Sequence, residues 1–139
     1  MEKTLAIIKP DAVQAGYTGE IIKRIEEDGL IIRAMRMEHL DRKRAEGFYY
    51  VHRQKSFFNE LINFMTSGPC VLLVLSAYNV INRWRNLMGP TDPKSGHPDT
   101  IRRAMGTNIE RNAVHGSDSK DSAVYEVNYF FKGTEIFER

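Results

Sequence analysis

The sequence predicts an α+β or α/β sandwich, in which helices cover a sheet. Short apolar runs of strand length alternate along the chain with segments of helical periodicity. Hydrophobic residues make up 42% and charged residues 27% of the chain, which is close to the average for globular proteins. A chain of 139 residues is long enough to bury a proper core without disulfides. We therefore expect a single domain over residues 1–139.

Two strands and one helix are predicted in the first forty residues. Residues 4–8 form a short apolar run that ends at Lys9-Pro10, which is typical of a buried strand. Residues 19–28 place three isoleucines on one face of an amphipathic helix. Residues 30–40 predict a second strand, although their alternation of polar and apolar side chains is imperfect.

The middle of the chain predicts three helices and a central strand. Asp41 can cap a helix that continues to Tyr50. Residues 57–65 predict the next helix, which ends before a Ser-Gly-Pro turn. Residues 70–76 are apolar and rich in β-branched side chains, as expected of a central strand. Residues 80–88 predict another helix, which stops at a Gly-Pro pair.

The last third of the chain contains a long segment with little regular structure. Residues 89–112 carry six proline or glycine residues and predict only a short helix at residues 100–105. A loop of this length in a compact domain suggests a functional role. Residues 113–115 predict a short strand, and residues 119–131 predict the last helix.

Charge and cysteine content exclude several classes of protein. Lys and Arg number 20 and Asp and Glu 18, so the formal charge of +2 is too small for a broad nucleic-acid surface. Cys70 is the only cysteine, which excludes an intrachain disulfide and favours a cytoplasmic location. The first apolar run is too short for a signal peptide or a membrane span. The glycine-rich phosphate-binding motifs are absent.

Among the four histidines, His115 has neighbours that could make it reactive. Gly116 leaves room for a ligand beside the imidazole, and Ser117 offers a hydroxyl within reach. Glu126, in the predicted last helix, could hold one ring nitrogen. The other nitrogen would then be free to act as a nucleophile or a base. The alternative interpretation is a surface or structural histidine.

The positive charge is concentrated in the segment that leads to His115. Residues 79–118 hold six basic residues against four acidic ones, whereas the rest of the chain is neutral. Arginine side chains suit phosphate oxygens, so this segment is a candidate phosphate site, with a solvated charged loop as the alternative. Phe57 could stack on a nucleobase or belong to the core. Lys9 could reach into a site at the sheet edge or be a simple charge at the end of a strand.

The chain closely resembles the nucleoside diphosphate kinase family over essentially its whole length. The resemblance rests on TLAIIKPDAV, FYYVHRQKSFF, FMTSGP, LMGPT, DTIR and above all NAVHGSDS, in the order and spacing of the family. It implies a ferredoxin-like α+β fold with a four-stranded antiparallel sheet covered by helices. It also implies transfer of the γ-phosphoryl group of a nucleoside triphosphate, typically ATP, to a nucleoside diphosphate. That transfer would follow a ping-pong mechanism through phospho-His115.

The resemblance also implies roles for other residues. The positions that match nucleotide-binding residues of the family are Lys9, Phe57, Arg85, Thr91, Arg102 and Asn112. The positions that match groups supporting the histidine are Tyr49, Ser117 and Glu126. Mg²⁺ is the implied cofactor, held mainly by the phosphates and not by protein side chains.

The implied partners are nucleoside di- and triphosphates and further copies of the chain, in a tetramer or a hexamer. No membrane and no dedicated nucleic-acid surface are expected. One alternative is a catalytically silent ferredoxin-like module that senses nucleotides, but such a module need not keep His115 together with Ser117 and Glu126. Another is a histidine phosphatase, whose Arg-His-Gly motif is missing because Val114 precedes His115.

Overall fold

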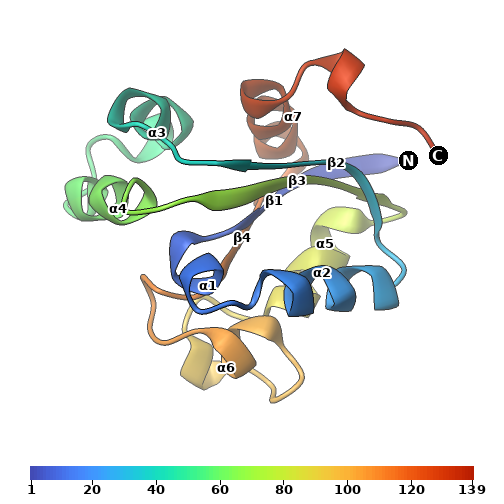
Figure 1. Ribbon diagram of the computed structural model, residues 1–139, viewed down its shortest axis with the longest axis horizontal. Helices are drawn as coiled ribbons and strands as arrows, with labels where there is room; N and C mark the ends of the chain where they lie inside the picture. Colours follow the sequence, from blue (N-terminus) through green and yellow to red (C-terminus); the bar gives the residue numbers. More distant parts are fainter.

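The computed structural model describes all 139 residues and contains one four-stranded antiparallel sheet (Figure 1). The strands lie in the order β2-β3-β1-β4. Their bounds are Glu2–Ile8 for β1, Ile31–Glu38 for β2, Cys70–Ala77 for β3 and Val114–Gly116 for β4. Together with the helices on both faces, this sheet confirms the expected ferredoxin-like α+β fold.

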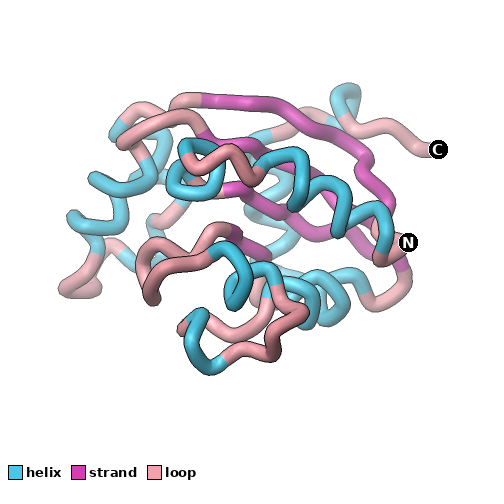
Figure 2. The backbone as a smooth tube through the Cα atoms, turned by 60° about the horizontal axis from the view of Figure 1, so that its bottom comes forward, coloured by secondary structure: helices cyan, strands magenta, loops and turns pink.

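Helices cover both faces of the sheet (Figures 1 and 2). The face drawn below the sheet in Figure 1 carries α1 (Pro10–Gln14), α2 (Thr18–Glu27), α5 (Val80–Met88) and α6 (Ile101–Met105). The opposite face carries α3 (Arg42–Phe48) and α7 (Lys120–Phe130), and α4 (Phe58–Met65) packs into the same buried cluster as these two helices. None of these helices combines the length and the hydropathy needed to span a bilayer.

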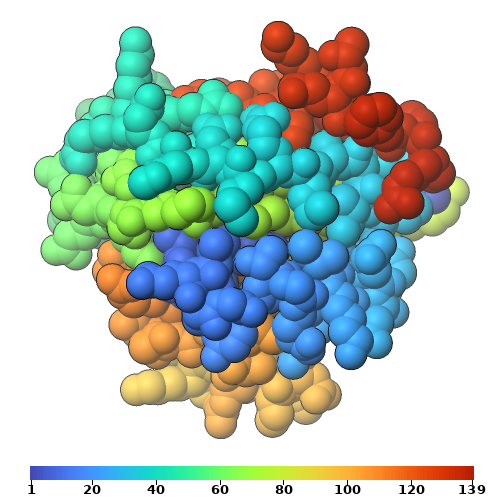
Figure 3. All heavy atoms as spheres, viewed as in Figure 1, coloured from blue at the N-terminus to red at the C-terminus, as the bar shows by residue number.

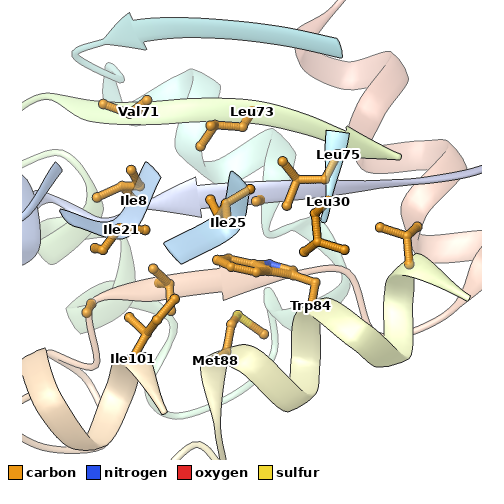
Figure 4. Close-up of a cluster of buried hydrophobic side chains, with 14 of the residues drawn as sticks. Ile8, Ile21, Ile25, Leu30, Val71, Leu73, Leu75, Trp84, Met88 and Ile101 are labelled. Carbon is orange, nitrogen blue, oxygen red and sulfur yellow. The ribbon is translucent and has the colours of Figure 1, made fainter. Parts of the chain in front are cut away.

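The two central strands divide their side chains between two buried clusters. Ala6 and Ile8 of β1 belong to the cluster beneath α2 and α5, whereas Leu5 and Ile7 belong to the cluster beneath α3 and α7. This division follows from the period of two in a strand. Because both faces are covered, every residue of β3 is buried, which explains its uninterrupted apolar sequence. Trp84 lies fully buried in the first cluster (Figure 4).

The pairing of β1 with β4 brings together residues that are far apart in the sequence. Ile7 lies opposite His115, and the amide of Lys9 donates to the carbonyl of Ala113 at 2.8 Å. Lys9 follows the end of β1, and Asn112 comes just before β4. Because the strands are antiparallel, these two residues meet at one end of the sheet.

The predicted strands and longer helices are present, with shifted bounds at most ends. The imperfect alternation of residues 30–40 has a physical cause, because β2 has an irregularity between Ile32 and Ala34 that leaves Arg33 and Ala34 both buried. The sequence pattern did not predict α1, which has five residues and begins at Pro10.

The other differences are short helical turns. A 3₁₀ turn at residues 50–52 follows α3, another lies within the long loop at residues 93–95, and a third follows α7 at residues 133–135. Figure 3 shows the long loop in gold and orange, next to the blue surface of α1 and α2. The Nη1 of Arg24 in α2 donates to the carbonyl of Asp99 at 3.3 Å and so links that helix to the loop.

Candidate active site

His115 projects from β4 toward α7, where a carboxylate holds its ring. Its Nε2 lies 2.8 Å from Oε1 of Glu126, and the hydroxyl of Ser117 donates to the same oxygen at 2.8 Å. Because a carboxylate only accepts hydrogen bonds, the neutral ring carries its proton on Nε2. Nδ1 makes no hydrogen bond within the chain and keeps its lone pair. The His115 side chain is 19% exposed, so a ligand can reach a ring that is otherwise fixed.

Two aromatic rings form a wall beside His115. The ring centroid of Phe48 lies 5.4 Å from that of His115, and the centroid of Tyr49 lies 6.3 Å away, both in edge-on arrangements. The hydroxyl of Tyr49 is buried without a hydrogen-bond partner. Burial, with smaller contributions from Cys70 and Glu126, raises the pKa of Tyr49, so the phenol stays protonated. Tyr49 therefore lies beside the histidine as a neutral hydroxyl group.

Lys9 is a buried cation at the end of β1. It is 8% exposed, and its Nζ donates to Oδ1 of Asn112 at 2.8 Å. Burial and, to a smaller extent, the nearby Arg102 lower the pKa of Lys9 to about 8. An ammonium group in this environment is stabilised by any anion that approaches it.

Two arginines add positive charge between α5, α6 and β4. Nη1 and Nη2 of Arg102 donate to the carbonyls of Gly89 at 3.0 Å and Val114 at 2.8 Å. Burial and the charge of Arg85 lower the pKa of Arg102 to about 10. Arg85 itself pairs with Asp118 at 2.7 Å. The effect of Arg85 on the pKa of Arg102 indicates that positive charge is concentrated here, which suits a polyanion.

Asn112 ties the long loop to this cationic cluster. Its Nδ2 donates to the carbonyl of Thr91 at 3.0 Å and to that of Ile109 at 2.9 Å. The side chain of Thr91 is exposed. The loop of residues 89–112 is therefore folded back on the residue that also contacts Lys9.

Phe57 stands apart from the cluster around His115. It precedes α4 and is 47% exposed, and its nearest aromatic neighbour is His52, with ring centroids 5.8 Å apart. The adjacent Phe58 packs against the cluster beneath α3 and α7 instead. The exposure of Phe57 favours the ligand-stacking interpretation over the core interpretation.

Nothing in the sequence pattern pointed to two further residues that hold this site. Oδ2 of Asp11 accepts from the amide of Ala113 at 3.1 Å, where the backbone has a φ of 74° that non-glycine residues rarely adopt. The indole Nε1 of Trp84 donates to the carbonyl of His115 at 3.1 Å. Both contacts are made to backbone atoms, so the only signal in the sequence is that each residue adjoins, or nearly adjoins, a predicted site residue.

The chain offers no metal-binding cluster of its own. No group of three or more His, Cys, Asp or Glu side chains lies close enough to hold an ion. The acidic groups around His115 already have partners, because Glu126 holds the imidazole and Asp118 holds Arg85.

A ferredoxin-like sandwich with a carboxylate-held histidine beside a lysine and two arginines defines a class of protein that handles phosphate groups. Comparison with known proteins agrees with this class. The family model described as nucleoside diphosphate kinase matches residues 2–136. The nucleoside diphosphate kinase of Desulfosudis oleivorans is 52% identical over 139 residues, and the match covers 100% of both chains. That of Chlamydia trachomatis is 54% identical over 136 residues, which cover 98% of this chain and 96% of the relative.

Solved structures give the same result. The nucleoside diphosphate kinase of Aquifex aeolicus superimposes with a TM-score of 0.95 at 44% identity, covering 97% of this chain and 98% of its own. The enzyme of Halobacterium salinarum, in complex with CDP, superimposes with a TM-score of 0.95 at 35% identity, covering 99% of this chain and 92% of its own. The chain belongs to the nucleoside diphosphate kinase family and is a phosphotransferase. Its reaction is the transfer of the γ-phosphoryl group of a nucleoside triphosphate to a nucleoside diphosphate.

Proposed function

We propose that His115 carries the phosphoryl group between the two nucleotides. The observation that supports this role most strongly is the 2.8 Å contact between Nε2 and Glu126, which leaves Nδ1 as the free nucleophile. The Nδ1 lone pair forms a bond to the γ-phosphorus while the bond from phosphorus to the bridging oxygen breaks and the diphosphate leaves. The ring becomes cationic, and the carboxylate of Glu126 stabilises that charge. In the second half-reaction a terminal oxygen of another diphosphate attacks phosphorus and releases the neutral imidazole.

The cationic side chains support the proposed nucleotide site. Arg85, Arg102 and the hydroxyl of Thr91 bind phosphate oxygens, and the fixed positive charge of the two arginines stabilises the transition state. Lys9 and Asn112, which are bonded to each other, contact the ribose and the adjoining phosphate. The remaining residues of the proposed site are Phe57, which stacks on the base, and Tyr49 and Ser117, which support the histidine. Stacking is indifferent to base identity, so we expect broad tolerance among nucleobases.

Mg²⁺ is proposed to enter with the nucleotide, held mainly by its phosphates. When bound, the ion would neutralise charge on the outer phosphates. The chain's own contribution is to orient the phosphates with Arg85 and Arg102 and to present Nδ1 of His115.

The proposed active form is a homo-oligomer, a tetramer or a hexamer of a single-domain chain in the cytoplasm. Met35 and Met37 on the edge strand β2 are 53% and 58% exposed, and such exposed apolar side chains support association between chains. The free and buried Cys70 suits a reducing compartment. The formal charge of +2 gives no support for a dedicated nucleic-acid surface.

Phosphorylation with ATP labelled in the γ position tests the proposed mechanism. With Mg²⁺, the wild-type chain should acquire an acid-labile label that GDP then removes as labelled GTP. His115→Ala should take no label, whereas His97→Ala, which changes an exposed histidine of the long loop, should be labelled like the wild type.

Each other outcome contradicts a specific part of the proposal. A label that survives His115→Ala would place the phosphoryl group elsewhere. A label released only as inorganic phosphate would indicate a phosphatase. Nucleotide binding without any label would indicate the catalytically silent sensing module.

A further inference from the structure

Trp84 connects the interior of the protein to the backbone of His115. It is the only tryptophan in the chain and is fully buried within α5. Figure 4 shows its indole among Leu30, Leu75 and Met88. On the side of the indole that faces β4, its Nε1–H donates to the carbonyl oxygen of His115 at 3.1 Å.

We propose that Trp84 is a positioning residue for His115, and that its indole N–H fixes the backbone from which the imidazole projects. This inference rests on the proposed role of His115 as the phosphoryl carrier. Trp84 does not touch the reacting atoms, because it lies on the face of the sheet opposite to Glu126 and the imidazole. Its effect is on where Nδ1 is held.

The strand that carries His115 needs such support because it is short and lies at an edge. β4 has three residues and pairs only with β1, so its outer side has no neighbouring strand. Two helix side chains support it: one binds the outward-facing carbonyl of Val114, and the other adds a bond to the carbonyl of His115, which faces β1. Arg102 of α6 donates to the carbonyl of Val114, and Trp84 of α5 donates to that of His115.

The contact between the indole and the strand is too close to be adjusted freely. A Cβ atom at Gly116 would lie 2.6 Å from Cδ1 of Trp84 and 2.8 Å from Cε of Met88. The strand therefore lies directly against the Cδ1–Nε1 edge of the indole, and we expect a shift of the ring to displace β4. The absence of a side chain at Gly116 makes room for Trp84 and Met88 in the core, and not for a ligand beside the imidazole as the sequence had suggested.

The same helix also positions a phosphate-binding group. Arg85 follows Trp84 in α5 and pairs with Asp118 at 2.7 Å, three residues beyond His115. Two consecutive residues of one helix thus bind the chain at His115 and just after it. We infer that α5 fixes the separation between the nucleophile and the proposed phosphate site.

This arrangement predicts an effect on turnover without a matching effect on substrate binding. Trp84 makes no hydrogen bond to Lys9, Phe57 or Asn112, so its replacement should leave the KM for nucleotides within about twofold. The kcat should fall about tenfold, because small displacements of a reacting group are costly in rate. The variant Trp84→Phe keeps an aromatic ring and removes the N–H donor.

Ile81→Val provides the matched control. Ile81 lies on the buried side of the same helix and in the same cluster, but its aliphatic side chain has no donor for the carbonyl of His115. Both variants and the wild type should be compared for kcat, KM, rate of γ-phosphoryl labelling and thermal stability. Ile81→Val should retain the wild-type kcat, whereas Trp84→Phe should lose turnover at an unchanged KM.

A spectroscopic measurement on the wild-type chain tests the contact without any substitution. Because Trp84 is the only tryptophan, ¹⁵N-labelled protein gives one indole N–H resonance. This resonance should exchange slowly with deuterium, since the N–H is buried and bonded. It should shift when ATP and Mg²⁺ phosphorylate His115 and return when GDP removes the phosphoryl group.

The outcomes separate this inference from the proposed function. A wild-type chain that takes no label from ATP would refute the role of His115 and the positioning role with it. Normal labelling combined with an indole resonance that does not move would overturn the role of Trp84 alone. Equal kcat values for Trp84→Phe and Ile81→Val would overturn it as well. Should Trp84→Phe fail to fold, the resonance of the wild type still decides.

Discussion

At the scale of single residues, the site combines groups whose protonation the fold has adjusted in different ways. Glu126 holds one nitrogen of His115 and leaves the other free. Burial keeps Tyr49 protonated and brings the pKa of Lys9 to about 8. At neutral pH Lys9 is charged, and His115 presents the ring nitrogen that Glu126 leaves free.

Lys9 gives the expected pH dependence of nucleotide binding. Its pKa of about 8 lies below the ordinary 10.5, so the free chain loses this charge as the pH rises through 8. A bound phosphate favours the charged form, and the affinity for a nucleoside diphosphate should fall by up to about tenfold per pH unit above 8. Calorimetric titration between pH 7 and pH 9.5 would measure this fall. Lys9→Met should bind more weakly with a flat profile, and an inflection that persists in Lys9→Met would assign it to another group.

The same lowered pKa has a consequence for stability with a defined sign. The unfolded chain keeps the Lys9 proton up to its ordinary pKa of 10.5, whereas the folded chain releases it near 8. Between these values the unfolded state binds more protons, so the Lys9 contribution to the free energy of unfolding rises with pH. Below pH 8 the buried ammonium destabilises the fold. Binding and stability therefore respond to Lys9 in opposite directions above pH 8.

At the scale of elements, the helix α3 places the aromatic wall beside His115. Phe48 ends this helix and Tyr49 follows it, and both rings lie edge-on to the imidazole. The start of the helix is fixed by Asp41, whose Oδ1 accepts from the amide of Arg44 at 2.8 Å. Tyr129 of α7 donates to the carbonyl of Arg44 at 2.8 Å and ties the two helices together. The cap therefore supports an element that adjoins the active site.

Removal of this cap should destabilise the protein with little effect on chemistry. Asp41→Ala leaves the amide of Arg44 without its partner and should lower the free energy of unfolding by about 1 kcal/mol. Asp41→Asn keeps an acceptor at the cap and should lose much less. Urea denaturation of the two variants at one protein concentration would measure the difference. Equal midpoints for Asp41→Ala and Asp41→Asn would show that the cap does not contribute.

The strands and longer helices were predictable from sequence because their cause is local. The uninterrupted apolar run of β3 and the cap at Asp41 each depend on a few neighbouring residues. The irregularity in β2 was visible only as imperfect alternation, since a single extra residue shifts the side chains that follow. The helix α1 is too short to show a helical period, so it could not be predicted in this way.

The contacts of the site were less predictable, because they join distant segments. Lys9 meets Asn112 across 103 positions only because β1 pairs with β4, and residue patterns do not give that pairing. Trp84 and Asp11 bind backbone atoms. Because every residue has a backbone carbonyl and nearly every residue an amide, the sequence does not show which of them a side chain will bind. Glu126 was predictable because it is close to His115 in sequence and in a helix that follows directly.

At the scale of the whole molecule, the sheet has two edges that are protected differently. On β4, the outward-facing carbonyl of Val114 accepts from Arg102 of α6. On β2, the chain beyond α7 covers the first part of the strand, where the amide of Phe137 donates to the carbonyl of Arg33 at 2.8 Å. Beyond that point Met35 and Met37 lie exposed on one face of the strand. Exposed apolar side chains on an edge strand favour association between chains.

Light scattering provides the test of this association. The wild-type chain should have four or six times the 16.0 kDa mass of one chain. Replacing both methionines, in Met35→Lys/Met37→Lys, places two charges on the exposed strand and should lower the measured mass, because an unpaired charge is costly to bury. Val124→Lys is the matched control, since Val124 is 63% exposed on α7, away from the edge. An unchanged mass in the double variant would place the contact between chains elsewhere, and a monomeric wild type would refute the proposed oligomer. If the double variant is smaller but still accepts label from ATP at His115, the active site is complete within one chain.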